Sequence, residues 1–331
     1  MNQKLVSAVT GANGFVGSHL VDLLLSKGQK VKCIVRGSSN LRWLEGKDVE
    51  IVNCGLFDKT GLAAALKDVD YLYHVAGVVK SKNEEGYFKG NVETTRNLLD
   101  VLLEVNPQIK KVVVVSSQTS GGPSESVDKP KKESDPSLPI TTYGRSKRAQ
   151  EELALSYSDK LPITIVRAPA IYGERDTEIY LVFRTYKQGL FTLIGFNDKK
   201  LSLIHVIDLV NGLYLAANSE KSNGQIYNIG SDVFYSWPEI AKEIKKSFGR
   251  GALTLRLPHF LVYSVAAVAQ FFALFSSKAA TFNLEKARDF VQSYWTMDIS
   301  KAQKELGYNQ MVSISEGIKR TIDWYKDNKW L

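Results

Sequence analysis

Tyr143 and Lys147 lie four residues apart in the segment TYGRSK, so a helix would place them on the same face. A tyrosine hydroxyl has a pKa of about 10, which is too high for efficient proton exchange at neutral pH. A neighbouring ammonium group stabilises the phenolate and lowers that pKa. The pair is therefore a candidate general acid–base, in which Tyr143 exchanges a proton and Lys147 adjusts its pKa.

A second group of polar residues supports this interpretation, since an isolated Tyr–Lys pair is more often an ordinary surface feature. The segment VVVVSSQTSGGP ends an apolar, strand-like run with hydroxyl side chains. In open parallel sheets, ligands bind at the carboxyl ends of the strands. Ser117 is therefore predicted to hydrogen-bond a substrate oxygen, which makes Ser117, Tyr143 and Lys147 the candidate catalytic residues.

Three glycines, Gly11, Gly14 and Gly17, stand between an apolar run and a helix-like run in AVTGANGFVGSHL. The first permits a tight turn, the second lets the backbone approach a pyrophosphate, and the third lets helix and strand pack closely. The pyrophosphate would lie against the start of the following helix, at Phe15 and Val16. A simple turn is the alternative, but the strand–helix alternation that follows favours dinucleotide binding.

The end of the second strand-like run predicts which dinucleotide is bound. NAD-binding units usually carry an acidic residue there, which holds the ribose 2′-hydroxyl. This chain instead has Arg36, followed by Ser38 and Ser39, in IVRGSSN. An arginine can pair with a 2′-phosphate, so we expect NADP to be preferred over NAD. The alternative is that Arg36 is a solvated residue without a ligand.

The wider sequence indicates the elements that position these residues. Short Val- and Ile-rich runs alternate with longer amphipathic ones, giving six strand candidates up to Arg167 and a seventh near residues 225–230. This pattern predicts an α/β fold with a doubly wound parallel (Rossmann) sheet and a smaller C-terminal substrate lobe of shorter helices and loops. The expected dinucleotide-binding domain is residues 1–168 plus 202–230, and the expected, interleaved substrate lobe is residues 169–201 plus 231–331.

The composition is that of an ordinary folded protein. The 331 residues are 44% hydrophobic and 24% charged, with a formal net charge of +8. The basic residues are scattered and form no aromatic-interleaved tract, so no nucleic-acid partner is expected. Cys33 and Cys54 lie in apolar runs and are expected to be buried thiols. We see no signal peptide and no run of 18 apolar residues, and we expect a cytoplasmic protein.

The C-terminal part contains a nearly continuous apolar run from Phe260 to Phe275, interrupted only by Ser264 and Gln270. It is too short to span a membrane comfortably. The favoured interpretation is a buried core helix. The alternatives are a lid over a lipid-like substrate and a helix at a membrane surface, so peripheral membrane contact stays open.

Several motifs in this order and spacing are similar to the extended short-chain dehydrogenase/reductase family, in its NAD-dependent epimerase/dehydratase branch. They are the glycine loop, YHVAG, SSQTSGGP, YGRSK and VRAPAIYG. The resemblance covers nearly the whole chain. The resemblance implies a catalytic Ser117 and Tyr143, with Lys147 holding the nicotinamide ribose and tuning the tyrosine. It further implies cofactor contacts for Ala76, Gly77 and Pro169, a mainly structural role for Asn91, and a homodimer.

The resemblance implies hydride transfer between a nicotinamide cofactor and a secondary alcohol or ketone carbon. The first expectation for the substrate is a nucleoside-diphosphate sugar, with Arg175, Arg184 and Arg256 as candidate cations for its diphosphate. The alternative is a hydrophobic ketone or alcohol, as in 3β-hydroxysteroid dehydrogenases and dihydroflavonol reductases. A non-catalytic NADPH sensor is the alternative of another class, against which Ser117, Tyr143 and Lys147 argue. No metal is expected, because His74 and His205 lack ligand spacing.

Overall fold

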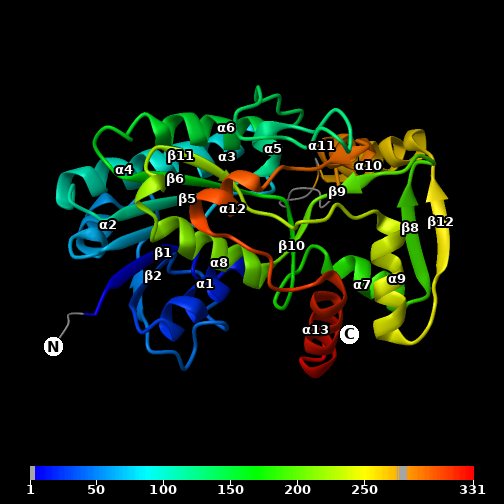
Figure 1. The fold of residues 1–331 in the computed structure, drawn as a ribbon, viewed down its shortest axis with the longest axis horizontal. Helices are drawn as coiled ribbons and strands as arrows, with labels where there is room; N and C mark the ends of the chain where they lie inside the picture. The colour runs from blue at the N-terminus through cyan, green and yellow to red at the C-terminus, as the bar shows by residue number, and fades with distance from the viewer. Residues whose placement is uncertain (1–3, 274, 276–281) are drawn as a thin grey trace.

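Seven parallel strands form the central sheet, as the alternating sequence pattern predicts. The computed structural model describes residues 4–273, 275 and 282–331. The strand order is β11-β6-β5-β4-β1-β2-β3, and every neighbouring pair is parallel. The strands are β1 (Val6–Thr10), β2 (Lys30–Val35), β3 (Glu50–Asn53), β4 (Tyr71–His74), β5 (Lys111–Ser117), β6 (Ile163–Ala168) and β11 (Gln225–Asn228). The expected doubly wound sheet is therefore confirmed (Figure 1).

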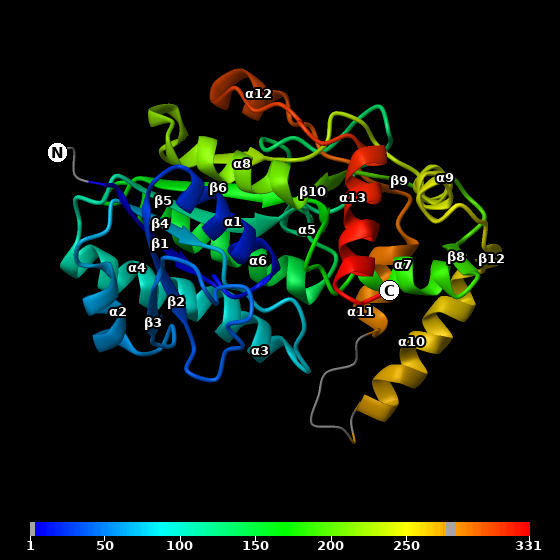
Figure 2. The same cartoon turned by 90° about the horizontal axis from the view of Figure 1, so that it is seen from below.

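Helices cover both faces of this sheet (Figure 2). One face carries α2 (Lys59–Leu66), α4 (Thr94–Val105) and α6 (Thr142–Leu155), and the other carries α1 (Phe15–Ser26) and α8 (Val206–Ala217). Because the central strands are buried on both sides, their sequences are continuous apolar runs rather than alternating ones. The remaining short helices of this part are α3 (Glu84–Phe88), η1 (Lys89–Glu93), α5 (Gln118–Gly121) and η2 (Glu220–Ser222).

The strand order reverses between β1 and β4, and this reversal determines where a ligand can bind. From β1 the chain runs outward through β2 and β3, and it then crosses back to β4 on the other side of β1. At such a reversal the connecting loops diverge and leave a crevice at the carboxyl ends of the strands. The glycine loop after β1 and the segment after β4 both lie at this edge.

The second region contains strands that the sequence pattern did not reveal. Shorter helices and loops were expected after Arg167, but three parallel two-stranded ladders occur there. The helices are α7 (Tyr180–Lys187), α9 (Trp237–Phe248), α10 (His259–Ala273), α11 (Leu284–Val291), α12 (Ser300–Leu306) and α13 (Ile314–Asp327). The ladders pair β7 (Ala170–Tyr172) with β10 (Leu203–His205), β8 (Leu190–Ile194) with β12 (Leu253–Leu257), and β9 (Lys200–Leu201) with β13 (Tyr294–Trp295). Strands of two to five residues are too short to produce a clear period in the sequence.

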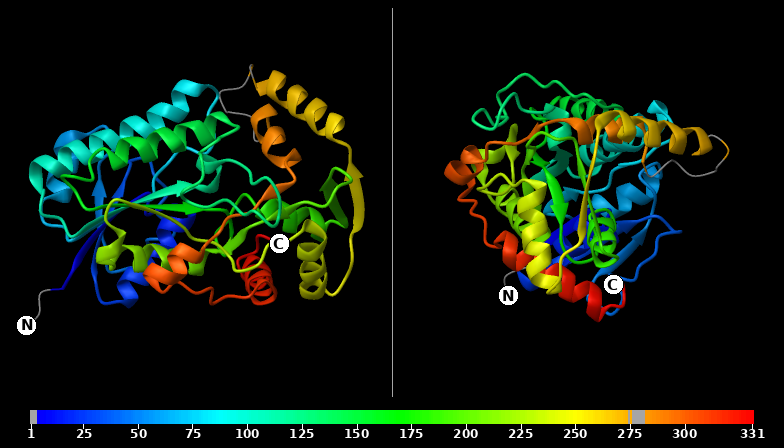
Figure 3. Two further views of the ribbon diagram at one scale, coloured as in Figure 1. Left: turned by 45° about the horizontal axis from the view of Figure 1, so that its top comes forward. Right: turned by 90° about the vertical axis from the view of Figure 1, so that its right-hand side faces the viewer.

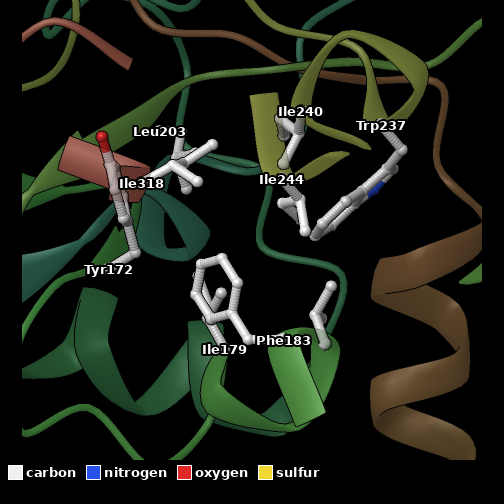
Figure 4. Close-up of a pocket in the computed structure, with 9 residues that line it drawn as sticks. Tyr172, Ile179, Phe183, Leu203, Trp237, Ile240, Ile244 and Ile318 are labelled. Carbon is white, nitrogen blue, oxygen red and sulfur yellow. The ribbon is translucent and has the colours of Figure 1, made fainter. Parts of the chain in front are cut away.

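The second region has a hydrophobic core of its own. Figure 4 shows the centre of this core, a small apolar pocket at which side chains of α7, α9 and α13 meet those of β7 and β10. The lining residues are Tyr172, Ile179, Val182, Phe183, Leu203, Trp237, Ile240, Ile244 and Ile318. None of them is a predicted site residue, so this pocket is part of the packing of the lobe. β7 falls in the expected substrate lobe and β10 in the expected dinucleotide-binding domain, so the β7–β10 ladder joins the two. The domain division expected from the sequence therefore stays a prediction.

The apolar run that begins at Phe260 forms a helix, but the helix is not part of the core. In α10 only Val262 and Ala266 are buried, whereas Phe260 and Phe272 are 72% and 67% exposed. The prediction of a buried core helix is therefore wrong. Periodicity could not reveal this, because a helix that is apolar on all sides is the usual signature of burial. Figure 3 shows α10 along the outer edge of the molecule.

Two further expectations are checked by the described residues. Cys33 and Cys54 are both free and buried, as predicted. Among the helices that the structure describes, none is long and apolar enough to cross a membrane.

Candidate functional site

The glycine loop between β1 and α1 leaves no room for a side chain at two of its positions. Gly11 has a φ of +67°, and a Cβ there would lie 2.9 Å from the Cα of Ala76. A Cβ on Gly17 would lie 2.1 Å from the carbonyl oxygen of Gly11, so α1 and the turn pack too closely for any side chain. These two glycines are required by geometry, and they bring the start of α1 to the edge of the sheet.

The N-terminus of α1 is suited to an anion. Gly14 is its N-cap residue and no side chain caps the helix. The first N–H groups of a helix, here those of Phe15 and Val16, have no partner within the helix and carry the positive end of its dipole. The arrangement therefore fits the pyrophosphate of a dinucleotide, which is the group that the sequence predicts here.

The turn after β2 carries the predicted selector of the cofactor. Ile34 pairs with Thr10 across the sheet, so Arg36 emerges beside the glycine loop. Arg36 is exposed, and within the described residues its guanidinium has no hydrogen bond or ion pair. The N–H of Ser39 donates to the carbonyl of Arg36 at 2.9 Å, which keeps Ser38 and Ser39 in the same turn.

The segment after β4 is held by Asn91 from η1. The side chain of Asn91 accepts from the N–H of Val78 at 2.7 Å and donates to its carbonyl oxygen at 3.1 Å. It also donates to the hydroxyl of Ser146 on α6 at 2.9 Å. Asn91 therefore fixes the loop containing Ala76 and Gly77 relative to α6, which agrees with the structural role that the resemblance implies.

Tyr143 and Ser117 are brought together from two elements. Tyr143 lies in the first turn of α6, and Ser117 ends β5 and is the N-cap residue of α5. Burial raises the pKa of Tyr143 to about 12, and a hydrogen bond with the Ser117 side chain opposes that rise. The Ser117 hydroxyl also accepts from the Thr119 hydroxyl at 2.9 Å. The predicted hydroxyl pair is thus assembled at the carboxyl end of β5.

Lys147 lies one turn further along α6 and is buried. Its ammonium donates to the carbonyl oxygen of Val115 at 2.7 Å and to the side-chain oxygen of Gln150. Burial lowers the pKa of Lys147 to about 8, and the negative charge of Glu151 opposes that shift. The backbone of Gly77 approaches this ammonium, since a Cβ there would lie 3.8 Å from Nζ. Lys147 therefore joins α6 to β5 and lies beside the loop after β4.

A buried ionic network behind β5 was missed by the sequence analysis. Glu151 and Arg167 form two charged hydrogen bonds, at 2.7 Å and 2.9 Å, and both side chains are almost fully buried. Glu151 also accepts from the hydroxyls of Ser116 and Ser120, which flank Ser117. One signal was present, because Glu151 follows Lys147 by four residues and so continues the same helix face.

The second region reaches the site through α11. The Glu285 carboxylate accepts from the N–H of Thr142, so α11 lies against the first turn of α6. Asp289 lies one turn further on, and its negative charge raises the pKa of Tyr143. Its Oδ1 is buried, with no hydrogen bond within the described residues. Burial raises the pKa of the Asp289 carboxyl to about 7. The sequence analysis gave no role to either acid.

The three arginines proposed for a diphosphate do not form one site. Arg175 donates to Ser18 and Asp22 on α1, at 3.1 Å and 2.8 Å. Arg184 lines a surface recess with the C-terminal residues of the chain, and Arg256 donates to the carbonyl of Gly195 at 3.2 Å. The three candidate arginines therefore have three different sets of neighbours, and a diphosphate contact by any one of them stays a prediction.

The two histidines have structural environments, as expected. His74 bonds to the hydroxyls of Thr10 and Thr95 at 2.8 Å and 2.9 Å, and burial lowers its pKa to about 3. His205 lies 3.4 Å from the Glu174 carboxylate. No cluster of potential metal ligands occurs among the described residues. Pro169, the last predicted cofactor contact, is buried directly after β6.

Comparison with known proteins agrees with this geometry. The model of the NAD dependent epimerase/dehydratase family matches residues 7–230. The chain is 27% identical over 327 residues to a ceramide reductase of Caulobacter vibrioides, covering 98% of this chain and 96% of the relative. It is also 27% identical over 337 residues to a UDP-N-acetyl-alpha-D-glucosaminuronate decarboxylase of Bacillus cytotoxicus, covering 96% and 97%.

A solved structure has the same fold. UDP-glucuronic acid 4-epimerase from Bacillus cereus, crystallised with NAD, aligns with a TM-score of 0.79 at 23% identity, over 98% of this chain and 99% of the epimerase. The family match spans the glycine loop, the Tyr143–Lys147 helix and all seven strands of the sheet. The chain belongs to the NAD dependent epimerase/dehydratase family and is an enzyme.

Proposed function

We propose that this enzyme catalyses reversible, NADP-linked reduction of a ketone to a secondary alcohol in a substrate with a long apolar chain. The observation that supports this substrate class is the exposed apolar helix α10, whose partner α11 lies against the first turn of α6. The proposal puts the alternative substrate before the nucleotide sugar that the sequence favoured, because the three candidate arginines for a diphosphate have three different sets of neighbours.

The proton-transfer step uses Tyr143. In the reductive direction the Tyr143 hydroxyl donates its proton to the substrate oxygen, and Ser117 holds that oxygen through a hydrogen bond. When bound, a reduced nicotinamide supplies the hydride that the ketone carbon receives. The Lys147 ammonium stabilises the phenolate that the transfer leaves, since a nearby positive charge favours the charged form of a phenol.

The preference for NADP rests on Arg36. The side chain emerges beside the glycine loop and is not engaged by the described part of the protein, so it is available to a 2′-phosphate. The following residues, Ser38 and Ser39, offer hydroxyls to the same group. No carboxylate occurs in the turn to hold a ribose 2′-hydroxyl in the manner typical of NAD sites.

The substrate class is also supported by one relative and opposed by another. The ceramide reductase of Caulobacter vibrioides is named for a lipid and covers almost the whole chain. The decarboxylase of Bacillus cytotoxicus is named for a UDP-sugar at the same identity. A nucleotide sugar is therefore the second candidate, and the relative from Bacillus is the observation that favours it.

The test is a direct competition between the two substrate classes. NADPH oxidation is measured with long-chain ketones dispersed in detergent, and with UDP and dTDP 4-keto sugars. We expect turnover with the long-chain ketones and no competitive inhibition by UDP or dTDP. Turnover of a keto sugar, together with inhibition by its nucleoside diphosphate, would support the second candidate instead. Arg184→Ala serves as a check, because loss of one arginine should leave turnover of an apolar ketone unchanged.

A further inference from the structure

The outer side of α10 is an apolar surface with no protein partner among the described residues. We call it the α10 face; it contains Phe260, Leu261, Val265, Val268, Phe271 and Phe272. Their spacing places them on one side of the helix. The opposite side contacts α11 through Val262, Ala266 and Ala287. Exposed apolar patches of this kind normally mark an interaction site.

The charged residues in the sequence between α9 and α11 are of one sign. Residues 244–284 contain no aspartate or glutamate, and residues 257–277 contain no Lys or Arg either. The basic residues of this stretch are Lys245, Lys246, Arg250, Arg256 and Lys278. An uncharged apolar helix within an acid-free, basic stretch complements a surface that is apolar inside and anionic outside.

We propose that the α10 face docks on the surface of an anionic lipid bilayer, with its phenylalanines in the acyl-chain boundary and the exposed Arg256, which lies on β12 three residues before α10, near the headgroups. No described helix is long enough to span, so the contact lies in the plane of the interface. A second copy of the chain is the alternative occupant, and a loss of dimerisation without a loss of vesicle binding would reveal it.

The α10 face is linked to the candidate site through α11. The helix that packs beneath it, α11, contacts the start of α6 through Glu285 and carries Asp289 close to Tyr143. A lipid bilayer against α10 would therefore lie beside the candidate site. The docking itself does not depend on the proposed function, since a membrane-bound enzyme can act on either substrate class.

The test is co-sedimentation of the full chain with phosphatidylcholine vesicles, with and without phosphatidylglycerol. The double variant Phe271→Ser and Phe272→Ser removes two apolar side chains from the face, and Val268→Glu adds a negative charge without altering the α11 contact. Phe57→Ser is the matched control, because Phe57 is also exposed but lies in the turn between β3 and α2 of the sheet region. Far-ultraviolet circular dichroism and NADPH binding check that each variant is folded.

We expect the unaltered chain and Phe57→Ser to bind the anionic vesicles, with weaker binding at high salt. Both α10 variants should lose at least about tenfold in affinity while still binding NADPH, because buried phenylalanines dominate such partitioning. Equal binding by folded α10 variants, or no binding by the unaltered chain, would overturn the proposal. So would a change from dimer to monomer in the variants without any change in vesicle binding. Turnover of a water-soluble ketone should persist in them, which separates docking from the proposed reaction.

Discussion

Two regions meet at Tyr143, the sheet region with the glycine loop and the C-terminal region with α10 and α11, and their side chains are engaged in different ways. Around the glycine loop, polar contacts and close backbone approaches determine nearly every position, as with Gly17 against Gly11 and Asn91 against Val78. Around α10 and α11, apolar side chains point outward, and the Oδ1 atom of a buried carboxyl, Asp289, has no hydrogen bond within the described residues. The first region is held mainly by contacts within the chain, whereas the second has exposed apolar groups and a buried carboxyl oxygen with no partner among the described residues.

This difference indicates that the first region carries out the step common to many substrates and that the second region recognises the particular substrate. A preorganised polar region suits a step common to many substrates, since fixed donors act without reorganisation. A region with unsatisfied apolar and polar groups suits recognition, because those groups gain partners only when something binds. We therefore expect substitutions in the first region to affect cofactor binding or the chemical step, and those in the second to affect substrate and pH dependence.

The largest effect is expected at Tyr143. Tyr143→Phe removes the proton donor but keeps the ring, so turnover should fall by roughly 10²–10⁴-fold. NADPH affinity should change little, and titration of cofactor fluorescence checks this. Near-normal turnover in the folded variant would remove Tyr143 from the chemical step.

Gly17→Ala tests the close packing of the first region. The new Cβ would lie 2.1 Å from a backbone oxygen that cannot move aside freely. Overpacking of this kind costs about 1–3 kcal/mol of the free energy of unfolding. Gly251→Ala is the matched control, since its Cβ would meet nothing closer than 3.9 Å. Equal midpoints for the two variants in urea denaturation would contradict the role given to Gly17.

Arg36→Ala tests the selection of the cofactor. A hydrogen bond to a charged group contributes about 1.5–3 kcal/mol, so NADPH should bind roughly 10–100-fold more weakly while NADH is spared. Arg36→Lys keeps the charge without the planar fork and should fall between the two. Parallel titrations with both cofactors measure this, and equal losses for NADPH and NADH would show that Arg36 does not contact the 2′-phosphate.

The smallest effect is expected at Asp289. Its negative charge raises the pKa of Tyr143, so Asp289→Asn should lower that pKa and move the alkaline limb of the pH–rate profile to lower pH. The shift should be less than about one pH unit, since Asp289 is one of several contributions. Asp323→Asn, on the exposed side of α13, should leave the profile unchanged. A shift to higher pH in Asp289→Asn would contradict the assignment.

The sequence predicted the first region well because its signals are local. The glycine spacing, the Val-rich β5 and the Tyr143–Lys147 interval each lie within one strand–turn–helix unit, where chain geometry leaves few choices. The predicted roles of these residues stay predictions until variants are measured. The Glu151–Arg167 pair was missed because its members come from α6 and β6, and only the fold brings them together.

The second region was predicted less well for physical reasons. The ladder β8–β12 joins residues about 60 positions apart, and no local pattern reports such pairing. The apolar run in α10 has the same composition whether it faces a protein core or a lipid surface, so hydrophobicity alone favoured the wrong environment. The three arginines were grouped by their place in the chain, but the fold directs them to different neighbours.

The proposed hydride transfer is tested most directly by following the hydrogen itself. The enzyme is incubated with a long-chain ketone and NADPH carrying deuterium at the nicotinamide C4 position, and the alcohol product is examined by mass spectrometry. We expect one deuterium at the carbinol carbon of the product, formed by the unaltered chain and at a greatly reduced rate by Tyr143→Phe. An alcohol without deuterium from either C4-labelled epimer, or equal rates for the two proteins, would contradict the proposed reaction.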